Sequence, residues 1–315
     1  MAISDAINGA TEPICKLIDA VSGAIGKAYE PRYYKRMADA KAYEIRRISE
    51  EIRNNSDLPI VHSDSSNLSV DISDYDELLK RTGKRIAYQE VTKQENIEKI
   101  VYDAYVQLSD VEQCDSSDIS REWMNRFINS AGDISTEELQ ILWSKILAGE
   151  VVSTNSFSIR TLECLRNMNM NDAKLFQNLC KIVVANKFVV RDRSILDSVE
   201  LSYDDILDMN DMGLINSSSD ITLNKTIIVS SVWDFDDYIL RGVSNKECEV
   251  VIPQFHLTQA GRELSKIVGE KIDLQTMKLV CRVIANNNKD VIFTLHQVTE
   301  RGLNNYSYSN IPIEF

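Results

Sequence analysis

The most strongly patterned stretch of the chain runs from Asp133 to Leu165. Ser135 followed three residues later by Glu138 is the pattern of a capping box, in which two side chains satisfy backbone amides that have no partner inside the helix. We therefore expect a helix of about four turns to begin here and to end at Gly149. Its apolar residues recur at intervals of three and four, which places them on one face: Leu139, Leu142, Trp143, Ile146 and Leu147.

A polar turn over residues 153–156 follows, and then a second short helix. The spacing of Phe157, Leu162 and Leu165 predicts that all three face inward. The two helices together are expected to form a buried hairpin around which the rest of the chain is organised. No pattern in the hairpin points to a catalytic role.

The same stretch resembles an uncharacterised bacterial domain family whose pattern is related to that of the abortive-infection alpha proteins. That family reads Leu-Trp-x-Lys-Leu-Leu-Ala-Gly-Glu, a spacer, and Ser-Phe-Ser-x-Arg-Thr-Leu. The matching residues here are Trp143, Ala148, Gly149, Glu150, Ser156, Phe157, Ser158, Arg160, Thr161 and Leu162. Thr154 and Asn155 stand where the family commonly has Pro-Gly. The resemblance extends from about Ile25 to Glu263, and it implies a bacterial cytoplasmic or membrane-associated protein in phage defence, without supplying catalytic residues.

Length and composition set limits on both fold and function. The chain has 315 residues, 43% of them apolar, which is enough for two domains, and a formal net charge of -13. This acidity argues against a general nucleic-acid binder, because neutralising phosphates requires clustered Lys and Arg. The six cysteines are widely scattered, as expected of unpaired thiols in a reducing compartment. We find neither a secretory signal pattern nor an uninterrupted apolar segment of about 18 residues.

Residues 1–28 have the pattern of an amphipathic helix that is rich in small residues. Such a helix packs closely against neighbours and is met in membrane bundles. An ordinary helix of a soluble bundle, or a disordered segment, is the alternative interpretation. The residues expected to face lipid or an assembly axis are Ile3, Ile7, Ile14, Leu17, Ile18, Val21 and Ile25. Behind them, Arg32, Lys35 and Arg36 are expected to anchor at lipid headgroups.

The basic stretch that contains these anchors, residues 27–47, carries seven basic and three acidic groups. A long solvated helix to about Arg53, held by ion pairs between residues four apart, is the alternative interpretation. Residues 54–74 are rich in Ser, Asp and Asn and are expected to form a linker.

A long helix is predicted from Tyr75 to Leu108. Four cations, Lys80, Arg81, Lys84 and Arg85, project from neighbouring positions on it, and Tyr88 follows. Clustered positive charges repel one another, which favours a nucleotide or oligonucleotide anion, or an acidic partner surface, as the ligand of this face. Neutralisation by the acidic residues one turn earlier is the alternative.

Residues 172–270 are expected to form a winged-helix-like unit. Ser202 and Asp205 should cap a helix that ends at Gly213, and strands are predicted over residues 221–230 and 248–257. The connection between these strands carries three aspartates, at 234, 236 and 237, where a DNA-binding wing would need basic side chains. A protein-contact role is therefore favoured for this unit.

The predicted fold class is mainly α, with a helical N-terminal and central bundle followed by an α+β winged-helix-like unit. The expected divisions are an amphipathic and a basic helix (1–53), a linker (54–74), a helical core (75–171), the winged-helix-like unit (172–270), and a helix and strand at the end (271–315). Known catalytic motifs are absent from the sequence and only three histidines are present, so we expect no enzyme, no metal site and no cofactor.

The leading functional hypothesis is a non-enzymatic, homo-oligomeric effector of bacterial anti-phage defence that contacts or permeabilises the inner membrane through its N-terminal helices. Its expected location is the cytoplasmic side of that membrane, or the cytoplasm. The alternatives are a soluble winged-helix DNA-binding regulator, and a scaffold for a separate defence enzyme encoded nearby.

Overall fold

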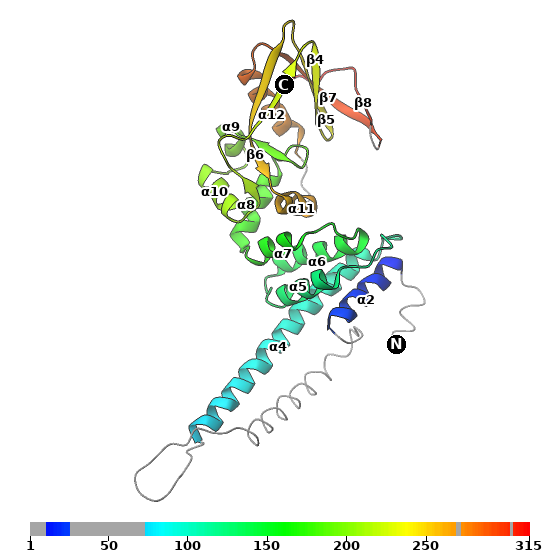
Figure 1. The fold of residues 1–315 in the computed structure, drawn as a ribbon, viewed down its shortest axis with the longest axis vertical. Helices are drawn as coiled ribbons and strands as arrows, with labels where there is room; N and C mark the ends of the chain where they lie inside the picture. Colours follow the sequence, from blue (N-terminus) through cyan, green and yellow to red (C-terminus); the bar gives the residue numbers. More distant parts are fainter. Residues whose placement is uncertain (1–10, 26–72, 269–271, 303–304) are drawn as a thin grey trace, which may run out of the picture. The chain divides into compact units, whose positions relative to one another are not determined.

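The computed structural model describes residues 11–25, 73–268, 272–302 and 305–315. Contacts divide the chain into two compact units, Met1–Thr154 and Asn155–Phe315 (Figure 1). The first unit is helical over its described residues, whereas the second combines helices with two antiparallel sheets. The chain is therefore an α+β protein, and the predicted class of a mainly α fold is wrong.

The first unit is built from four described helices: α2 (Glu12–Ile25), α4 (Ser73–Leu108), α5 (Arg121–Ala131) and α6 (Glu137–Val152). The C-terminal half of α4 packs against α6, and α2 packs mainly against α5. Aromatic rings form the centre of this core. Phe127 stacks on Trp123 and contacts Trp143, with ring centroids 5.2 Å apart in both pairs.

A buried polar joint fixes α4 to the turn between α5 and α6. The Asn96 side-chain amide donates to the Gly132 carbonyl oxygen at 2.8 Å. The Gln140 amide donates to the Asn96 side-chain oxygen at 3.2 Å and to the Ile134 carbonyl oxygen at 2.9 Å. Because buried polar groups need partners, this joint sets the position of α4 along the core.

The ends of α6 differ from the prediction, whereas its buried face agrees with it except at Leu142, which is only half-buried. Leu139, Trp143, Ile146 and Leu147 are buried as expected. The helix begins at Glu137 after Thr136, which makes no side-chain cap, so the predicted Ser135 capping box is wrong. The helix also continues through Gly149 to Val152, because the amide of Ser153 still bonds to the Gly149 carbonyl oxygen at 2.9 Å.

The second unit begins inside the expected hairpin, since the unit boundary lies between Thr154 and Asn155. Its helices are α7 (Ile159–Arg166), α8 (Met170–Cys180), α9 (Arg193–Asp197), α10 (Tyr203–Asp211), α11 (Gln259–Val268) and α12 (Leu274–Asn287). Phe157, Leu162 and Leu165 are buried, as predicted. The capping box of α10 and its close at Gly213 are also confirmed, because the Leu214 amide bonds to the Met209 carbonyl oxygen at 3.0 Å.

The first sheet is organised on one long strand, β6 (Cys248–Leu257). β3 (Thr222–Ile227), which covers most of the strand predicted over residues 221–230, pairs antiparallel with the first half of β6. β1 (Phe188–Val190) and β2 (Ile215–Asn216) pair with the second half.

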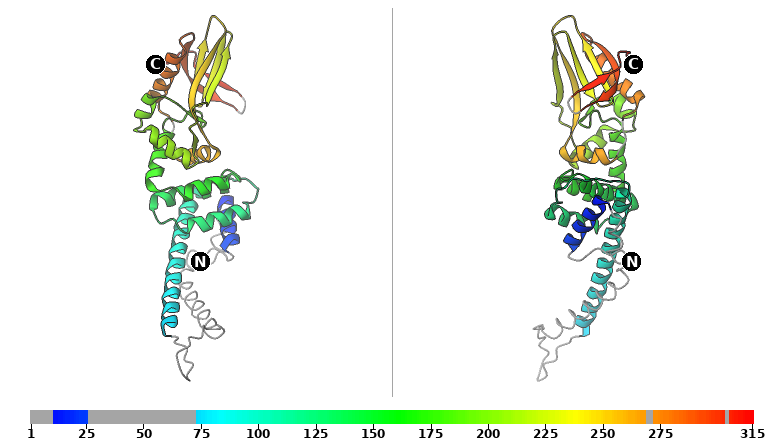
Figure 2. Two further views of the ribbon diagram at one scale, coloured as in Figure 1. Left: turned by 60° about the vertical axis from the view of Figure 1, so that its left-hand side comes forward. Right: turned by 90° about the vertical axis from the view of Figure 1, so that its right-hand side faces the viewer.

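The second sheet has the order β4-β5-β7-β8, and of its strands only β7 corresponds to a predicted one, the strand expected within residues 271–315. β4 (Ser230–Phe235) and β5 (Tyr238–Val243) form a hairpin in the region expected to be an acidic connection. β7 (Ile292–Arg301) and β8 (Tyr306–Tyr308) complete the sheet, and α12 lies beside β7 (Figure 2). Asp236 turns the hairpin with φ 60°, a conformation that Asp adopts more readily than most residues. The aspartates therefore mark a tight turn and not an open wing.

Candidate functional site

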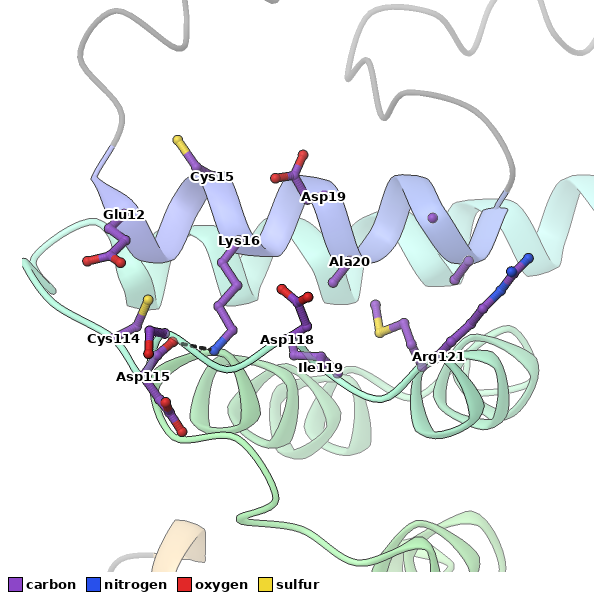
Figure 3. A pocket seen from close by; sticks show the side chains of 14 residues that line it. Glu12, Cys15, Lys16, Asp19, Ala20, Cys114, Asp115, Asp118, Ile119 and Arg121 are labelled. Carbon is purple, nitrogen blue, oxygen red and sulfur yellow. Dashed lines mark hydrogen bonds between the residues drawn. The ribbon is translucent and has the colours of Figure 1, made fainter.

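A cleft of about 610 Å³ lies in the first unit between α2 and the loop that precedes α5 (Figure 3). Lys16 reaches from α2 toward the loop, whereas Cys15 points away from it. The Lys16 ammonium donates to the Asp115 carbonyl oxygen at 2.8 Å and to the Thr154 hydroxyl oxygen at 2.9 Å. Lys16 is thus a polar anchor that ties α2 to the loop and to the end of α6.

The remaining groups of the cleft do not form a reactive set. Glu12 and Asp118 contribute carboxylates, and Arg121 contributes a cation. Burial, reinforced by the Glu12 carboxylate, raises the pKa of the Cys114 thiol above its ordinary value. Because the thiolate is the reactive form of cysteine, this thiol lacks the activation of a catalytic nucleophile.

The structure places three of the five predicted membrane-contact residues of α2 in the protein's own interior. Ile14, Leu17 and Val21 are 7%, 1% and 0% exposed, and Ile18 and Ile25 are half-buried. The apolar stripe of α2 is therefore covered by protein in this conformation. The other predicted contacts, Ile3, Ile7, Arg32, Lys35 and Arg36, lie outside the described residues.

The predicted cationic face is present on the N-terminal half of α4, which extends beyond α5 and α6. We define it by Lys80, Arg81, Lys84, Arg85 and Tyr88, all of which are exposed. The Arg85 guanidinium donates to the side-chain oxygen of Gln89 at 2.9 Å.

The geometry of α4 brings these groups together. A rise of about 1.5 Å and a rotation of about 100° per residue place Lys80, Lys84 and Tyr88 in one row, with Arg81 and Arg85 in the next. Successive cations along a row are thus about 6 Å apart along the axis. Tyr88, at 74% exposure, stands at the end of the first row with its ring open to a ligand.

The residues of the sequence signature have a structural role in the second unit. The buried carboxylate of Glu263, on α11, accepts from the Ser158 amide at 2.6 Å and from the Thr161 hydroxyl at 2.5 Å. The other oxygen of the Glu263 carboxylate accepts from the side-chain amide of Gln259 at 2.8 Å. Ser158 also caps α7 through its side chain. This Glu263 joint fastens α7 to α11, and sequence spacing alone offered no signal for it.

The three aspartates near the β4–β5 turn are exposed, and Arg301 lies among them. Arg301 holds Asp234 through two hydrogen bonds, of 2.8 and 2.7 Å, and also donates to the Asp236 carbonyl oxygen. The Arg301 guanidinium keeps the pKa of Asp234 below its ordinary value. The turn is therefore partly neutralised, yet it still lacks the exposed bases that a DNA-binding wing requires.

Within residues 11–25, 73–268, 272–302 and 305–315, no cluster of His, Cys, Asp and Glu has the arrangement of a metal site. All six cysteines are free thiols. His256 and His296 bond to backbone carbonyl oxygens of the second unit, at 2.8 Å each. Among these same residues, every helix is too short or too polar to cross a bilayer.

The fold and its exposed surfaces define an α+β protein with a long projecting helix and a cationic face as its clearest candidate site. Residues 80–281 match a family model described as "Protein of unknown function (DUF2806)". The match spans more than half of the chain, so the protein belongs to this family. Neither the curated proteins nor the solved structures include a match to it.

Proposed function

We propose that this protein is a non-enzymatic effector of bacterial anti-phage defence that binds a nucleotide or oligonucleotide anion through the cationic face of α4. The observation that supports this proposal is the exposure of four cations and one tyrosine on the same side of a projecting half-helix. The defence context rests on the resemblance of the Leu142–Leu165 stretch to the abortive-infection alpha pattern.

The chemistry of the face suits a single-stranded nucleic acid better than a lone phosphate. Lys and Arg neutralise successive phosphates, and an exposed aromatic ring offers a surface on which a base stacks. The chain as a whole has a net charge of -13, so phosphates are attracted only where cations gather. Binding is thus expected to be local to α4 and strongly dependent on salt.

Fluorescence polarisation with a short labelled single-stranded oligonucleotide tests this proposal. The variant Lys80→Ala/Arg85→Ala should bind more weakly, and the slope of log affinity against log salt should become shallower by about 1.4 for two lost phosphate contacts. The matched control, Lys99→Ala/Arg126→Ala, removes two exposed cations that pair with Asp103 and Glu122 outside this face. Equal weakening in both variants, or no binding by the unmodified protein, would refute the assignment.

Membrane contact by α2 is the second candidate function. Because α2 is packed against its own unit in the structure, this function requires the helix to leave that position. Ile14, Leu17 and Val21 must leave the core of the first unit, which costs about 1.5–3 kcal/mol per side chain before lipid covers them again. Lys16 supplies the polar anchor against this release, through its bonds to Asp115 and Thr154.

Flotation with anionic liposomes tests the membrane role on the full chain. Lys16→Ala removes the anchor and should increase the fraction of protein that floats, whereas Lys99→Ala should leave it unchanged. If the Lys16 variant floats no more than the unmodified protein, release of α2 is not a route to the membrane.

A further inference from the structure

The outward face of α4 carries apolar and aromatic side chains at the spacing of a coiled-coil seam. Tyr88, Val91, Tyr102 and Tyr105 are 74%, 41%, 57% and 43% exposed. Tyr102 follows Tyr88 by fourteen residues, and Tyr105 follows Val91 by the same number, which is two heptads. Tyr88 and Val91 are three residues apart, as are Tyr102 and Tyr105, and this is the spacing of heptad positions a and d. The residues that α4 buries in its own unit, such as Ile100, lie on the opposite side of the helix.

The charges along this seam are arranged symmetrically and with opposite sign. Lys84 lies four residues before Tyr88, and Glu95 lies four residues after Val91. Arg81 lies seven residues before Tyr88, and Glu98 lies seven after Val91. All four are a or d positions of the same heptad register. The part of the seam from Arg81 to Glu98 is therefore complementary to its own reverse, and it is the part that carries the pairing.

We infer that α4 is a self-association surface on which a second copy of this chain pairs antiparallel. In that arrangement Tyr88 lies opposite Val91 of the second copy, and Lys84 and Arg81 lie opposite Glu95 and Glu98. Twofold symmetry repeats each of these pairs. A parallel arrangement would set every charge against its own copy, and like charges that face one another across an interface are destabilising.

This inference goes beyond the proposed anion binding and does not depend on it. An oligonucleotide and a second copy of the chain would nevertheless both contact Arg81, Lys84 and Tyr88, so they exclude each other on α4. The paired state is accordingly the state without ligand, and a bound oligonucleotide is expected to lower the fraction of paired chains.

Sedimentation of the full chain, freed of nucleic acid by a high-salt wash, tests the pairing. The unmodified protein should dimerise as its concentration rises. Lys84→Glu and Glu95→Lys should each weaken dimerisation by about tenfold, since each turns two attractive pairs into two repulsive ones. Both substituted side chains are exposed, so neither change disturbs the core of the first unit.

The decisive sample is an equimolar mixture of the two single variants. Antiparallel pairing gives the mixed dimer opposite charges at both contacts, and the mixture should recover the affinity of the unmodified protein, as should the Lys84→Glu/Glu95→Lys chain. Lys99→Glu, outside the a and d positions, is the matched control and should have no effect. A monomer at all concentrations, or a mixture as weak as its components, would overturn the inference, and neither result bears on oligonucleotide binding.

Discussion

Replacing Glu263 by Ala should loosen the second unit at the contact between α7 and α11. Thr161 is fully buried, so its hydroxyl cannot turn to water when the carboxylate is removed and keeps only the Ser158 hydroxyl, at 3.0 Å, as a partner. The half-buried Ser158 amide is left without its 2.6 Å partner. Hydrogen bonds to a charged acceptor contribute about 1.5–3 kcal/mol each. Because the Ser158 amide is partly rehydrated, we expect a total loss of about 3 kcal/mol.

Hydrogen-exchange mass spectrometry measures this loss where it occurs. At 1.4 kcal/mol per tenfold change, about 3 kcal/mol corresponds to exchange roughly 100-fold faster in peptides that cover α7 and α11. Glu263→Gln is the matched variant. It keeps an acceptor for Ser158 and Thr161, and Gln259 can reorient its amide toward the new side chain, so we expect a loss below about 1 kcal/mol. The reasoning fails if Glu263→Ala exchanges like the unmodified protein, or if the two variants behave alike.

Three further predictions follow from the packing and the charges. Gly261→Ala should lower the thermal midpoint, because its new Cβ would lie 2.0 Å from a main-chain carbonyl oxygen, whereas Gly23→Ala, with open space around it, should not. Arg301→Ala should destabilise the protein more at neutral pH than in acid, where only its bond to the Asp236 carbonyl oxygen remains to be lost. The pKa of Asp234 is lowered by Arg301, so the contribution of this ion pair is present above the ordinary value of 3.8 and is lost as pH falls through the lowered pKa; thermal midpoints of both proteins from pH 7 to pH 2.5 should converge. Cys281, whose pKa burial raises to about 12, should stay unmodified by iodoacetamide until the protein unfolds, as peptide mass spectrometry would show.

Local patterns were sufficient to predict the elements whose apolar face and caps lie close together in sequence. The long helix expected over residues 75–108 is α4, at Ser73–Leu108. Ser202, Asp205 and Gly213 act at the two ends of α10 as predicted. In these cases the residues that decide the structure are neighbours along the chain, so their spacing carries the information.

Features that depend on distant residues were not predictable in this way. Glu263 reads as an ordinary helix residue until Ser158, 105 positions away, is placed beside it. The aspartates of the β4–β5 turn suggested an open acidic connection. Their partner Arg301 lies 67 positions from Asp234, so local sequence did not show that Arg301 neutralises this carboxylate. The candidate site divides along the same line: the cationic face of α4 is a local pattern, whereas the cleft beside α2 requires two segments about a hundred residues apart.

The apolar stripe of α2 illustrates a different gap between sequence and structure. Its three-and-four spacing correctly shows that one side of the helix is removed from water. Spacing does not state whether protein or lipid covers that side. Here α5 and α6 cover it, because Ile14, Leu17 and Val21 lie in the core that those helices complete.

The Glu263 joint can form only late in synthesis of the chain, because Ser158 is made long before Glu263. At about 5–20 residues per second, a ribosome needs roughly 5–20 s to advance from Ser158 to Glu263. For about that long after it emerges from the ribosome, α7 lacks the helix that fastens it, and its buried leucines are available to chaperones or to other nascent chains. A stop codon placed just before α11 would make that exposure permanent, so such fragments should be recovered mainly as aggregates or with bound chaperone.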